Sequence, residues 1–320
     1  MKLLFNGFRH GHINALYAKA MADERVCVVG CIEENAEAKS AARAKLKVEF
    51  SDKSYDEWLA SDIDAVAIGM AFGDRGKAII KALKAKKHVI ADKPVCTSLA
   101  ELEEIRRLAK ENGLTVACML DLRYLPQALK AKEILNSCIL GEVKNVAFNG
   151  QHYLDYAHRP SWYFEDGKHG GTINDLAIHG IDLVRMLTGL EFAKTDAARV
   201  WNSYAFKTKN FKDAALFMAR LENGAGVLAD VSYSAPSQAF KMPSYWEFRF
   251  WCEKGMLSFN YVDNKVTLYK EGETQAEVFE GVTDCGDYLD EFINGTSDTE
   301  NVLNSTETAL LIQKDADKNP

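Results

Sequence analysis

Residues 2–12 of the chain read Lys2-Leu3-Leu4-Phe5-Asn6-Gly7-Phe8-Arg9-His10-Gly11-His12. The apolar run at 2–5 predicts a buried strand, and the apolar spacing at 13–21 predicts a helix directly after the loop. Dinucleotide-binding folds place their phosphate loop here, and N–H groups at the start of the helix bind a pyrophosphate. The loop matches Gly-x-Gly-x-x-Gly poorly, because it has only two glycines at the wrong spacing. An ordinary turn of an α/β fold is an equal alternative for the loop alone.

Strands and helices alternate through the first third of the chain. Strands are predicted at 26–32, 65–68, 88–91 and 115–119, and helices at 36–46, 55–61, 75–85 and 99–111. Apolar strands that alternate with helices form a parallel sheet covered on both faces. Ligands bind beyond the carboxyl ends of the strands in such sheets, so the residues that follow each strand are candidates for a binding site.

Glu33 follows the second predicted strand. It lies about 20 residues after the glycine loop, where an acid binds the ribose hydroxyls of a dinucleotide. Residues 34–37 contain no Arg or Lys that could hold a 2′-phosphate, so the sequence favours NAD over NADP. An acid that only starts the next helix would also be favoured here by the helix dipole.

Two later strand ends add further candidates. Gly69 and Ala71 follow the strand at 65–68, and small residues there let the backbone approach a cofactor. Lys93 follows the strand at 88–91, and Pro94 restricts the turn that presents the lysine. Taken alone, Lys93 would more often be an ordinary surface lysine.

Residues 170–182 read Gly-Gly-Thr-Ile-Asn-Asp-Leu-Ala-Ile-His-Gly-Ile-Asp. Their apolar spacing predicts a helix over 173–187, on which Asp175 and His179 lie one turn apart on the same face. A carboxylate in that place can fix the tautomer of an imidazole and raise its basicity, as in a general base. A structural ion pair has the same spacing, and structural pairs outnumber catalytic ones.

Length and composition limit the class of protein. A chain of 320 residues fits two domains, and 47% hydrophobic with 27% charged residues is typical of a globular protein. A net charge of -7 without a basic tract argues against a nucleic-acid partner. The seven scattered cysteines indicate a reducing compartment rather than a disulfide framework. No stretch approaches the ~20 apolar residues that span a membrane, so we expect a soluble cytoplasmic protein without a membrane partner.

Several segments together resemble the Gfo/Idh/MocA oxidoreductases. Residues 88–94 resemble the family's Glu-Lys-Pro segment, with Asp92 in place of the usual Glu, and 170–182 resemble its Gly-Gly-Gly-x-x-x-Asp-x-x-x-His-x-x-Asp segment. Residues 121–126 are similar to the domain-crossing Asn-Arg-Arg-Phe-x-Pro. The chain departs from the family pattern in the glycine loop, at Asp92, and at 72–75, where many members have Asn-His-x-His.

The resemblance implies an α/β fold of two domains. A Rossmann domain, a doubly wound parallel sheet that binds a dinucleotide, is expected at 1–120. A substrate-binding and oligomerisation domain with a large, mostly antiparallel open sheet is expected at 121–320. The sequence itself predicts strands at 143–153, 196–204, 214–221, 225–234, 246–252, 256–260 and 265–270, and helices at 125–137, 287–294 and 305–316. The family also implies a homodimer or homotetramer through the second sheet.

The family's activity carries over to three positions. The expected reaction moves a hydride between a secondary alcohol of a sugar or polyol and NAD, with NADP less favoured. His179 would accept the hydroxyl proton, Asp175 would orient the imidazole or hold a neighbouring hydroxyl, and Lys93 would place positive charge beside the developing alkoxide. The residues expected to bind the cofactor are Gly7, Phe8, Arg9, His10, Gly11, His12, Glu33, Gly69, Ala71, Asp92 and Lys93.

The segment at 152–163 is the expected substrate lining, because its aromatic rings and polar side chains suit a pyranose or polyol. An ordinary loop that packs Trp162 and Tyr163 against the sheet is the alternative. The residues expected to contact substrate are Arg123, Tyr153, Arg159, Trp162, Tyr163, Asp175 and His179.

Three other functions compete with a dehydrogenase. The four histidines at 152, 158, 169 and 179 lack the spacing of metal ligands and have no cysteine nearby, so we expect no metal. An NAD-dependent glycosidase of the same family would turn over sugar without net consumption of NAD. A catalytically inactive NAD-binding regulator would explain the irregular glycine loop, but it has no need of Lys93, Asp175 and His179 together.

Overall fold

The computed structural model describes residues 1–319 and divides into two compact units. Unit 1 comprises Met1–Met119, Glu165–Gly170 and Asp287–Glu307, and unit 2 comprises Leu120–Phe164, Gly171–Gly286 and the chain from Thr308 onward. We expected every residue after 120 in the second domain, whereas two later segments group with the first unit. No helix among residues 1–319 combines the length and the apolar composition of a membrane span.

Specific contacts hold the two later segments in unit 1. Gly73 N–H donates to the Lys168 carbonyl at 2.8 Å, and Lys168 Nζ donates to the Asp74 carboxylate at 2.7 Å. Helix α8 (Tyr288–Ile293) packs against α1 and β5 of unit 1, and Lys19 donates to Asp287 at 2.5 Å. The sequence pattern carries no sign of these contacts, because they join residues far apart in the chain.

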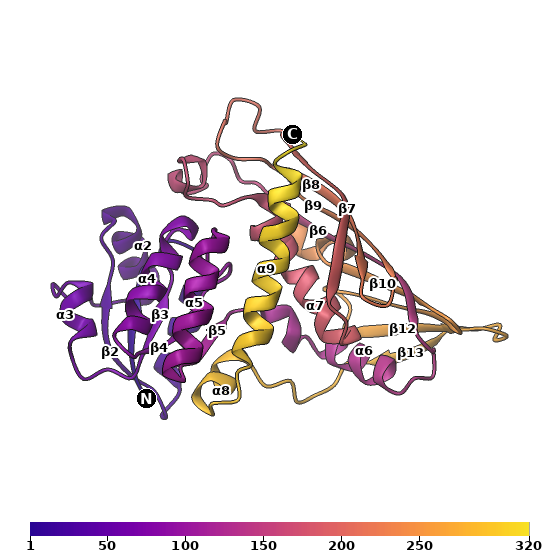
Figure 1. Ribbon diagram of the computed structural model, residues 1–320, viewed down its shortest axis with the longest axis horizontal. Coiled ribbons are helices and arrows are strands. Elements are labelled where there is room, and N and C mark those ends of the chain that lie inside the picture. The colour runs from indigo at the N-terminus through magenta and orange to yellow at the C-terminus, as the bar shows by residue number, and fades with distance from the viewer. Residues whose placement is uncertain (320) are drawn as a thin grey trace. The chain divides into compact units, whose positions relative to one another are not determined.

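The core of unit 1 is a five-stranded parallel sheet with the strand order β2-β1-β3-β4-β5 (Figure 1). Its strands are β1 (Lys2–Asn6), β2 (Cys27–Ile32), β3 (Ala65–Ile68), β4 (His88–Ala91) and β5 (Val116–Cys118). Every residue of β3 is buried, and successive side chains point to opposite faces, so both faces of the sheet are covered. The predicted doubly wound fold is confirmed.

Polar side chains cap several helices of unit 1. The helices of this unit are α1 (His12–Ala22), α2 (Ala36–Leu46), α3 (Tyr55–Leu59), α4 (Phe72–Lys84) and α5 (Leu99–Asn112). The Asn35 side chain caps α2, and Ser54 with Glu57 forms a capping box at α3. Helix α4 begins at Phe72, a buried residue three positions before the predicted start.

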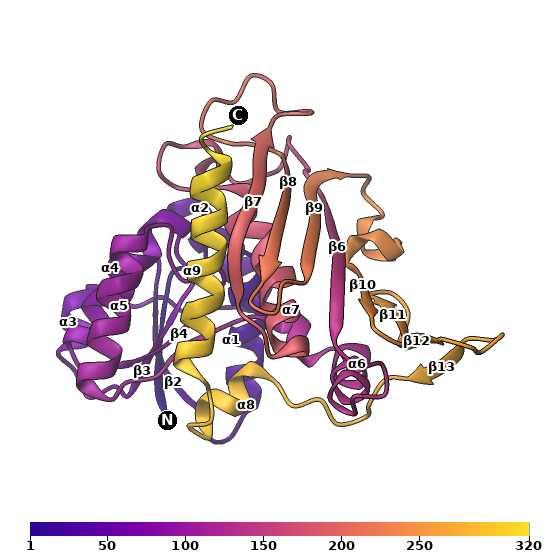
Figure 2. The ribbon, with the colours of Figure 1, turned by 45° about the vertical axis from the view of Figure 1, so that its right-hand side comes forward.

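Unit 2 is built on an eight-stranded sheet with the order β13-β12-β11-β10-β6-β9-β8-β7. Its strands are β6 (Val143–Tyr153), β7 (Phe192–Trp201), β8 (Ala214–Leu221), β9 (Gly226–Ala235), β10 (Glu247–Cys252), β11 (Gly255–Asn260), β12 (Lys265–Lys270) and β13 (Glu277–Glu280). Neighbouring strands are antiparallel except β6 and β9, which are parallel (Figure 2). The predicted mostly antiparallel open sheet is confirmed.

One face of this sheet is covered by helices of the same unit. Helix α6 (Pro126–Asn136) packs against β11, β12 and β13, and α7 (Ile178–Thr188) packs against β6. Side chains alternate between buried and exposed along β8, and the exposed ones include Leu216 and Met218. The other face of the sheet therefore presents apolar side chains.

Three further elements differ from the sequence predictions. Strand β7 lies about four residues before its predicted place, because the chain turns after Trp201, where three successive backbone N–H groups from Ser203 donate to the buried Asp213 carboxylate. Helix α9 (Thr299–Ala316) begins six residues before the predicted start at 305. The short edge strand β13 was not predicted, because Glu-Val-Phe-Glu is mostly exposed and too short for a period.

Candidate functional site

The glycines of the first loop allow two strand ends in unit 1 to approach closely. Gly7 has φ +91°, and a Cβ there would lie 2.6 Å from the Met70 nitrogen. A Cβ at Gly69 would lie 2.4 Å from the Gly7 carbonyl oxygen, and Arg9 N–H donates to the Gly69 carbonyl at 2.8 Å. Gly11, in contrast, has no atom within 4 Å of an added Cβ. Gly7 and Gly69 are therefore required by backbone packing, and Gly11 keeps space open at the start of α1.

Glu33 fastens the glycine loop to the end of β2. The buried carboxylate accepts from Phe8 N–H at 2.6 Å through Oε2 and from Asn35 N–H at 2.8 Å through Oε1. Each carboxylate oxygen accepts more than one hydrogen bond, so ribose hydroxyls can still bind to Glu33. The acid thus has a structural role in the loop besides the predicted one.

A cavity of about 830 Å³ opens beside this loop within unit 1. Its lining includes Gly7, Arg9, Glu33 and Ala71, all of which the sequence placed at a cofactor site. The N-cap of α1 is Gly11, which has no side chain that could cap the helix, and Asn14 N–H donates to the Gly11 carbonyl at 3.2 Å. A cavity of this size, beside a buried carboxylate and the start of a helix, has room for the adenosine and pyrophosphate parts of a dinucleotide.

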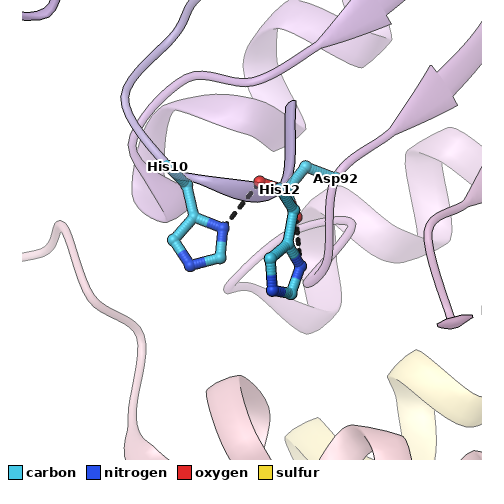
Figure 3. Close-up of side chains that lie close together, drawn as sticks. All are labelled: His10, His12 and Asp92. Carbon is cyan, nitrogen blue, oxygen red and sulfur yellow. Dashed lines mark hydrogen bonds and ion pairs between the residues drawn. The ribbon is translucent and has the colours of Figure 1, made fainter. Parts of the chain in front are cut away.

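Asp92 connects the end of β4 to two histidines of the loop (Figure 3). Its Oδ2 lies 2.7 Å from His10 Nδ1, and its Oδ1 lies 3.4 Å from His12 Nδ1. Burial alone would raise the pKa of Asp92, but the Arg75 guanidinium and His10 outweigh burial and hold this pKa well below its usual value. Burial lowers the pKa of His10 to about 4, so its imidazole is neutral at pH 7 and its Nδ1–H donates to Asp92.

Arg75 is a fully buried cation that the sequence reasoning did not assign to the site. Its guanidinium donates to Asp92 Oδ2 at 3.0 Å and to the Met70 carbonyl at 2.9 Å, and it lies 4.6 Å from the Phe72 ring centroid. Lys93 is 3% exposed, with Nζ 5.6 Å from the same ring centroid, and its peptide bond to Pro94 is cis. An arginine at the start of an apolar helix, with an acid at the next strand end, was the available sequence signal.

One group within residues 1–319 has the arrangement of metal ligands. Ligand atoms of His10, His12 and Asp92 lie within 4.8 Å of one another. A divalent cation there would be repelled by Arg75, which already offsets the Asp92 charge at 3.0 Å, and by the adjacent Lys93. We therefore interpret the group as a hydrogen-bond network.

The Asp175 and His179 segment of unit 2 starts with an unusually wide helical turn. Ile173–Ala177 forms a π-helix, and regular α-helix begins only at Ile178, so the expected α-helix from 173 is wrong for its first turn. Gly171 (φ +98°) precedes this turn, and Ile173 N–H donates to Gln313 Oε1 at 2.9 Å. A side chain contact thus replaces the regular helical start. Single π turns are frequent at functional sites.

Asp175 and His179 are both buried, and residues from other segments of unit 2 contact them. The Tyr233 hydroxyl of β9 donates to Asp175 Oδ2. Asp121 Oδ1 lies 3.5 Å from His179 Nδ1, and the Trp246 ring lies 5.7 Å from the His179 ring, measured between centroids. The sequence reasoning missed Tyr233, Asp121 and Trp246, because they come from three distant parts of the chain.

Arg123 is held by Asp182, an acid of the segment 170–182 that also contains His179. Its Nε donates to Asp182 Oδ2 at 2.6 Å, and its Nη2 donates to Asp182 Oδ1. Because Asp182 lies on α7 one turn beyond His179, this bidentate pair ties the segment Asp121–Tyr124 to the helix that carries the histidine. Arg123 therefore supports the Asp121–His179 contact.

The predicted substrate segment has a mostly buried aromatic part. Trp162 and Tyr163 are 1% and 2% exposed, with ring centroids 4.2 Å apart. Arg159 donates to the Leu154 carbonyl at 2.8 Å and to the Tyr153 carbonyl at 2.6 Å. The Arg159 guanidinium thus braces its own loop, whereas the Tyr153 side chain is 42% exposed.

Comparison with known proteins identifies both units. Residues 5–119 match the family model described as "Oxidoreductase family, NAD-binding Rossmann fold", and residues 128–258 match the one described as "GFO/IDH/MocA C-terminal domain". The resemblance noted in the sequence and the expected nicotinamide cofactor are confirmed.

Two curated proteins of Bacillus subtilis (strain 168) are similar over part of their length. The chain is 27% identical over 196 residues to the uncharacterized oxidoreductase YrbE, an alignment that covers 59% of this chain and 54% of the relative. It is 25% identical over 226 residues to scyllo-inositol 2-dehydrogenase (NAD(+)), which covers 70% of this chain and 64% of the relative. The chain therefore spans between about half and two thirds of these relatives.

Solved structures resemble the whole chain. A levoglucosan dehydrogenase in complex with NADH and levoglucosan has a TM-score of 0.81 and 18% sequence identity, and the alignment covers 99% of this chain and 96% of that one. At this identity the similarity shows the fold alone.

Proposed function

Because the chain belongs to the Gfo/Idh/MocA family of oxidoreductases, we propose that it transfers a hydride between a secondary alcohol of a sugar or polyol and NAD. The observation that carries this proposal is the pair of buried ionisable side chains in unit 2, Asp175 and His179. Burying a carboxylate and an imidazole is costly, and such groups concentrate at catalytic sites.

His179 is the general base in this proposal. Oxidation of an alcohol requires the hydroxyl to lose its proton as the hydride leaves carbon, and a neutral imidazole can accept that proton. Asp121, 3.5 Å from Nδ1, stabilises the imidazolium that forms. Arg123 keeps Asp121 in place through its bidentate contact with Asp182 on the same helix as His179.

Asp175 and Lys93 carry the remaining roles. Asp175, restrained by the Tyr233 hydroxyl, accepts a hydrogen bond from a substrate hydroxyl or orients His179. Lys93 places an ammonium group beside the developing alkoxide, where preorganised positive charge lowers the barrier. NAD, when bound, supplies the hydride acceptor. Glu33 would hold its ribose hydroxyls, and the uncapped start of α1 would hold its pyrophosphate.

A sugar or polyol is the substrate class that we propose. Relatives are named for scyllo-inositol and levoglucosan, which are rings carrying several hydroxyls. Around His179 in unit 2, carboxylates and the Trp246 ring combine hydrogen-bond acceptors with an aromatic face, the combination that such rings require.

The test is NAD binding followed by turnover on a panel of sugars and inositols. Purified protein should quench or shift NADH fluorescence, and at least one compound of the panel should give NADH from NAD. Lys93→Met should lower turnover much more than NAD affinity. Sugar cleavage without net NADH would identify the glycosidase instead, and NAD binding without turnover of any panel compound would identify the regulator.

Self-association through the second sheet is part of the same proposal. The sheet face opposite α6 and α7 exposes Leu216, Met218 and Leu228 on the neighbouring strands β8 and β9. Contiguous exposed apolar side chains of this kind mark interaction surfaces. Light scattering should give the mass of a dimer or tetramer, and Met218→Asp should shift the population to monomer. A monomer in the unsubstituted protein would refute this part of the proposal.

A further inference from the structure

We propose that Arg75 is a positioning residue for Lys93: its guanidinium fixes the backbone on both sides of the lysine. This inference rests on the proposed role of Lys93 and names the residue that prepares it. The family comparison does not supply Arg75, since the segment at 72–75 departs from the pattern found in many members.

The contacts of Arg75 are concentrated on the lysine turn. Nη1 donates to three successive carbonyls, those of Asp92 at 2.8 Å, Lys93 at 2.5 Å and Pro94 at 3.1 Å. Nη2 donates to Asp92 Oδ2 at 3.0 Å, and Nε donates to the Met70 carbonyl at 2.9 Å. One rigid planar group therefore restrains the residues before, at and after the lysine.

The same ring faces both cations. The Phe72 centroid lies 4.6 Å from Arg75 Cζ and 5.6 Å from Lys93 Nζ, and Phe72 is fully buried. Arg75 and Phe72 both belong to α4. Helix α4 thus restrains the lysine in two places, since Arg75 holds the backbone around Lys93 and Phe72 lies beside the Lys93 ammonium group. A change at Arg75 therefore affects the whole side chain of Lys93.

Asp92 has a separate task in this arrangement. Both Arg75 and Asp92 have 0% side-chain exposure, so each is the countercharge that allows the other to be buried. Two departures from the family pattern meet at this contact: Asp92 stands in place of the usual Glu, and Arg75 stands where many members have His. The effect of the Arg75–Asp92 charge pair and the effect of the hydrogen bonds from Arg75 to the carbonyls can therefore be tested separately.

The experiment compares Arg75→Met, Arg75→Lys and the double variant Arg75→Met/Asp92→Asn. Each is incubated with an amine-acylating reagent, and mass spectrometry follows the labelling rate of Lys93. Lys87 is the internal control, because its Nζ donates to the Ser61 and Ile63 carbonyls in the same unit but lies outside this turn. Thermal unfolding is recorded in parallel.

Arg75→Met should lower the midpoint of thermal unfolding, because it leaves the Asp92 charge buried without its arginine partner. The reagent should label Lys93 about tenfold faster in this variant, because the turn opens locally. The double variant should recover most of the decrease in the unfolding midpoint, since neither charge remains. Lys93 should still be labelled fast in it. Arg75→Lys keeps the positive charge but lacks the planar guanidinium that donates to several carbonyls. Lys93 should therefore be labelled fast in this variant as well. Lys87 should label at the same rate in every variant.

Lys93 labelling at the original rate in the folded double variant and in Arg75→Lys would overturn the proposal and leave Arg75 with only a charge-balancing role. Turnover adds a second measurement: with a panel compound that the unsubstituted enzyme oxidises, Arg75→Lys should lower kcat about tenfold with little change in KM. If no panel compound is oxidised, the proposed function fails, and the labelling rates still decide whether Arg75 restrains Lys93.

Discussion

Tyr233→Phe removes one hydroxyl from the buried acid–base cluster and should destabilise unit 2. Tyr233 is 3% exposed and donates to Asp175 Oδ2, and Asp175 is 1% exposed. The ring is retained in phenylalanine, so its contact with Phe211, 5.2 Å between centroids, and the stacking of Arg159 at 5.4 Å survive. The effect is therefore confined to the hydrogen bond.

A hydrogen bond to a charged group contributes about 1.5–3 kcal/mol, and a buried carboxylate that loses a donor also loses part of its solvation. For a domain of this size the loss corresponds to a decrease of about 3–12 °C in the unfolding temperature. Differential scanning calorimetry measures it, with Tyr269→Phe as the control, because Tyr269 is 49% exposed on β12.

A double-mutant cycle with Asp175→Asn identifies the partner of the hydroxyl. If the two groups interact as the structure shows, the double variant should be destabilised by less than the sum of the single variants, by about 1–2 kcal/mol. Equal unfolding temperatures for Tyr233→Phe and the unsubstituted protein, or strict additivity in the cycle, would refute this reasoning.

Three further predictions follow from positions elsewhere in the chain. Gly171→Ala should destabilise the fold by about 2–5 kcal/mol in urea unfolding, because φ is +98° and the new Cβ would lie 2.1 Å from a Gln313 atom; Gly113→Ala, with φ +63° and open space, should cost only about 1–2 kcal/mol. Fluorescence titration should show that Glu33→Ala binds the dinucleotide about tenfold more weakly than the unsubstituted protein does. It should also show that the unsubstituted protein prefers NAD to NADP. Equal affinities for the two dinucleotides would contradict the assignment of Glu33. Burial raises the pKa of the Cys31 thiol to about 12, so at pH 8 it should react with a disulfide reagent far more slowly than the exposed Cys138, and the difference should vanish in urea.

The local periodicities of the sequence were sufficient for most of the fold. Strand β3 and helix α2 have the predicted bounds, because four consecutive apolar residues and a clear Asn35 cap are signals contained within the segment itself. Strand β7 overlaps its prediction but is shifted, because its end is set by Asp213, a residue ten positions beyond Ser203, which accepts three backbone N–H groups. Helix α8 was predicted in place, but its membership of unit 1 depends on contacts with α1 that no local pattern contains.

The residues of the candidate site also divide into those with a local sequence signal and those that depend on distant partners. Asp175 and His179 could be selected from the sequence because their spacing is local. The wide turn at Ile173–Ala177 could not, since it depends on Gln313 supplying an acceptor to Ile173. Arg75 was visible in the sequence as a departure from the family pattern and as an arginine at the start of a predicted helix, but its role follows from its contacts with the Asp92 turn. Side chains that act through distant partners are therefore the part that sequence reasoning misses.

The role of His179 is the central claim, and one comparison tests it most directly. NADH formation from NAD is measured with the unsubstituted protein and with His179→Asn on the compound of the sugar and inositol panel that gives the highest rate. NAD affinity is measured in both proteins, and it should be nearly equal because the proposed cofactor residues lie in unit 1. Loss of an effective general base should lower kcat by about 10²–10⁴-fold. An unchanged kcat in His179→Asn, with NAD still bound, would contradict the account.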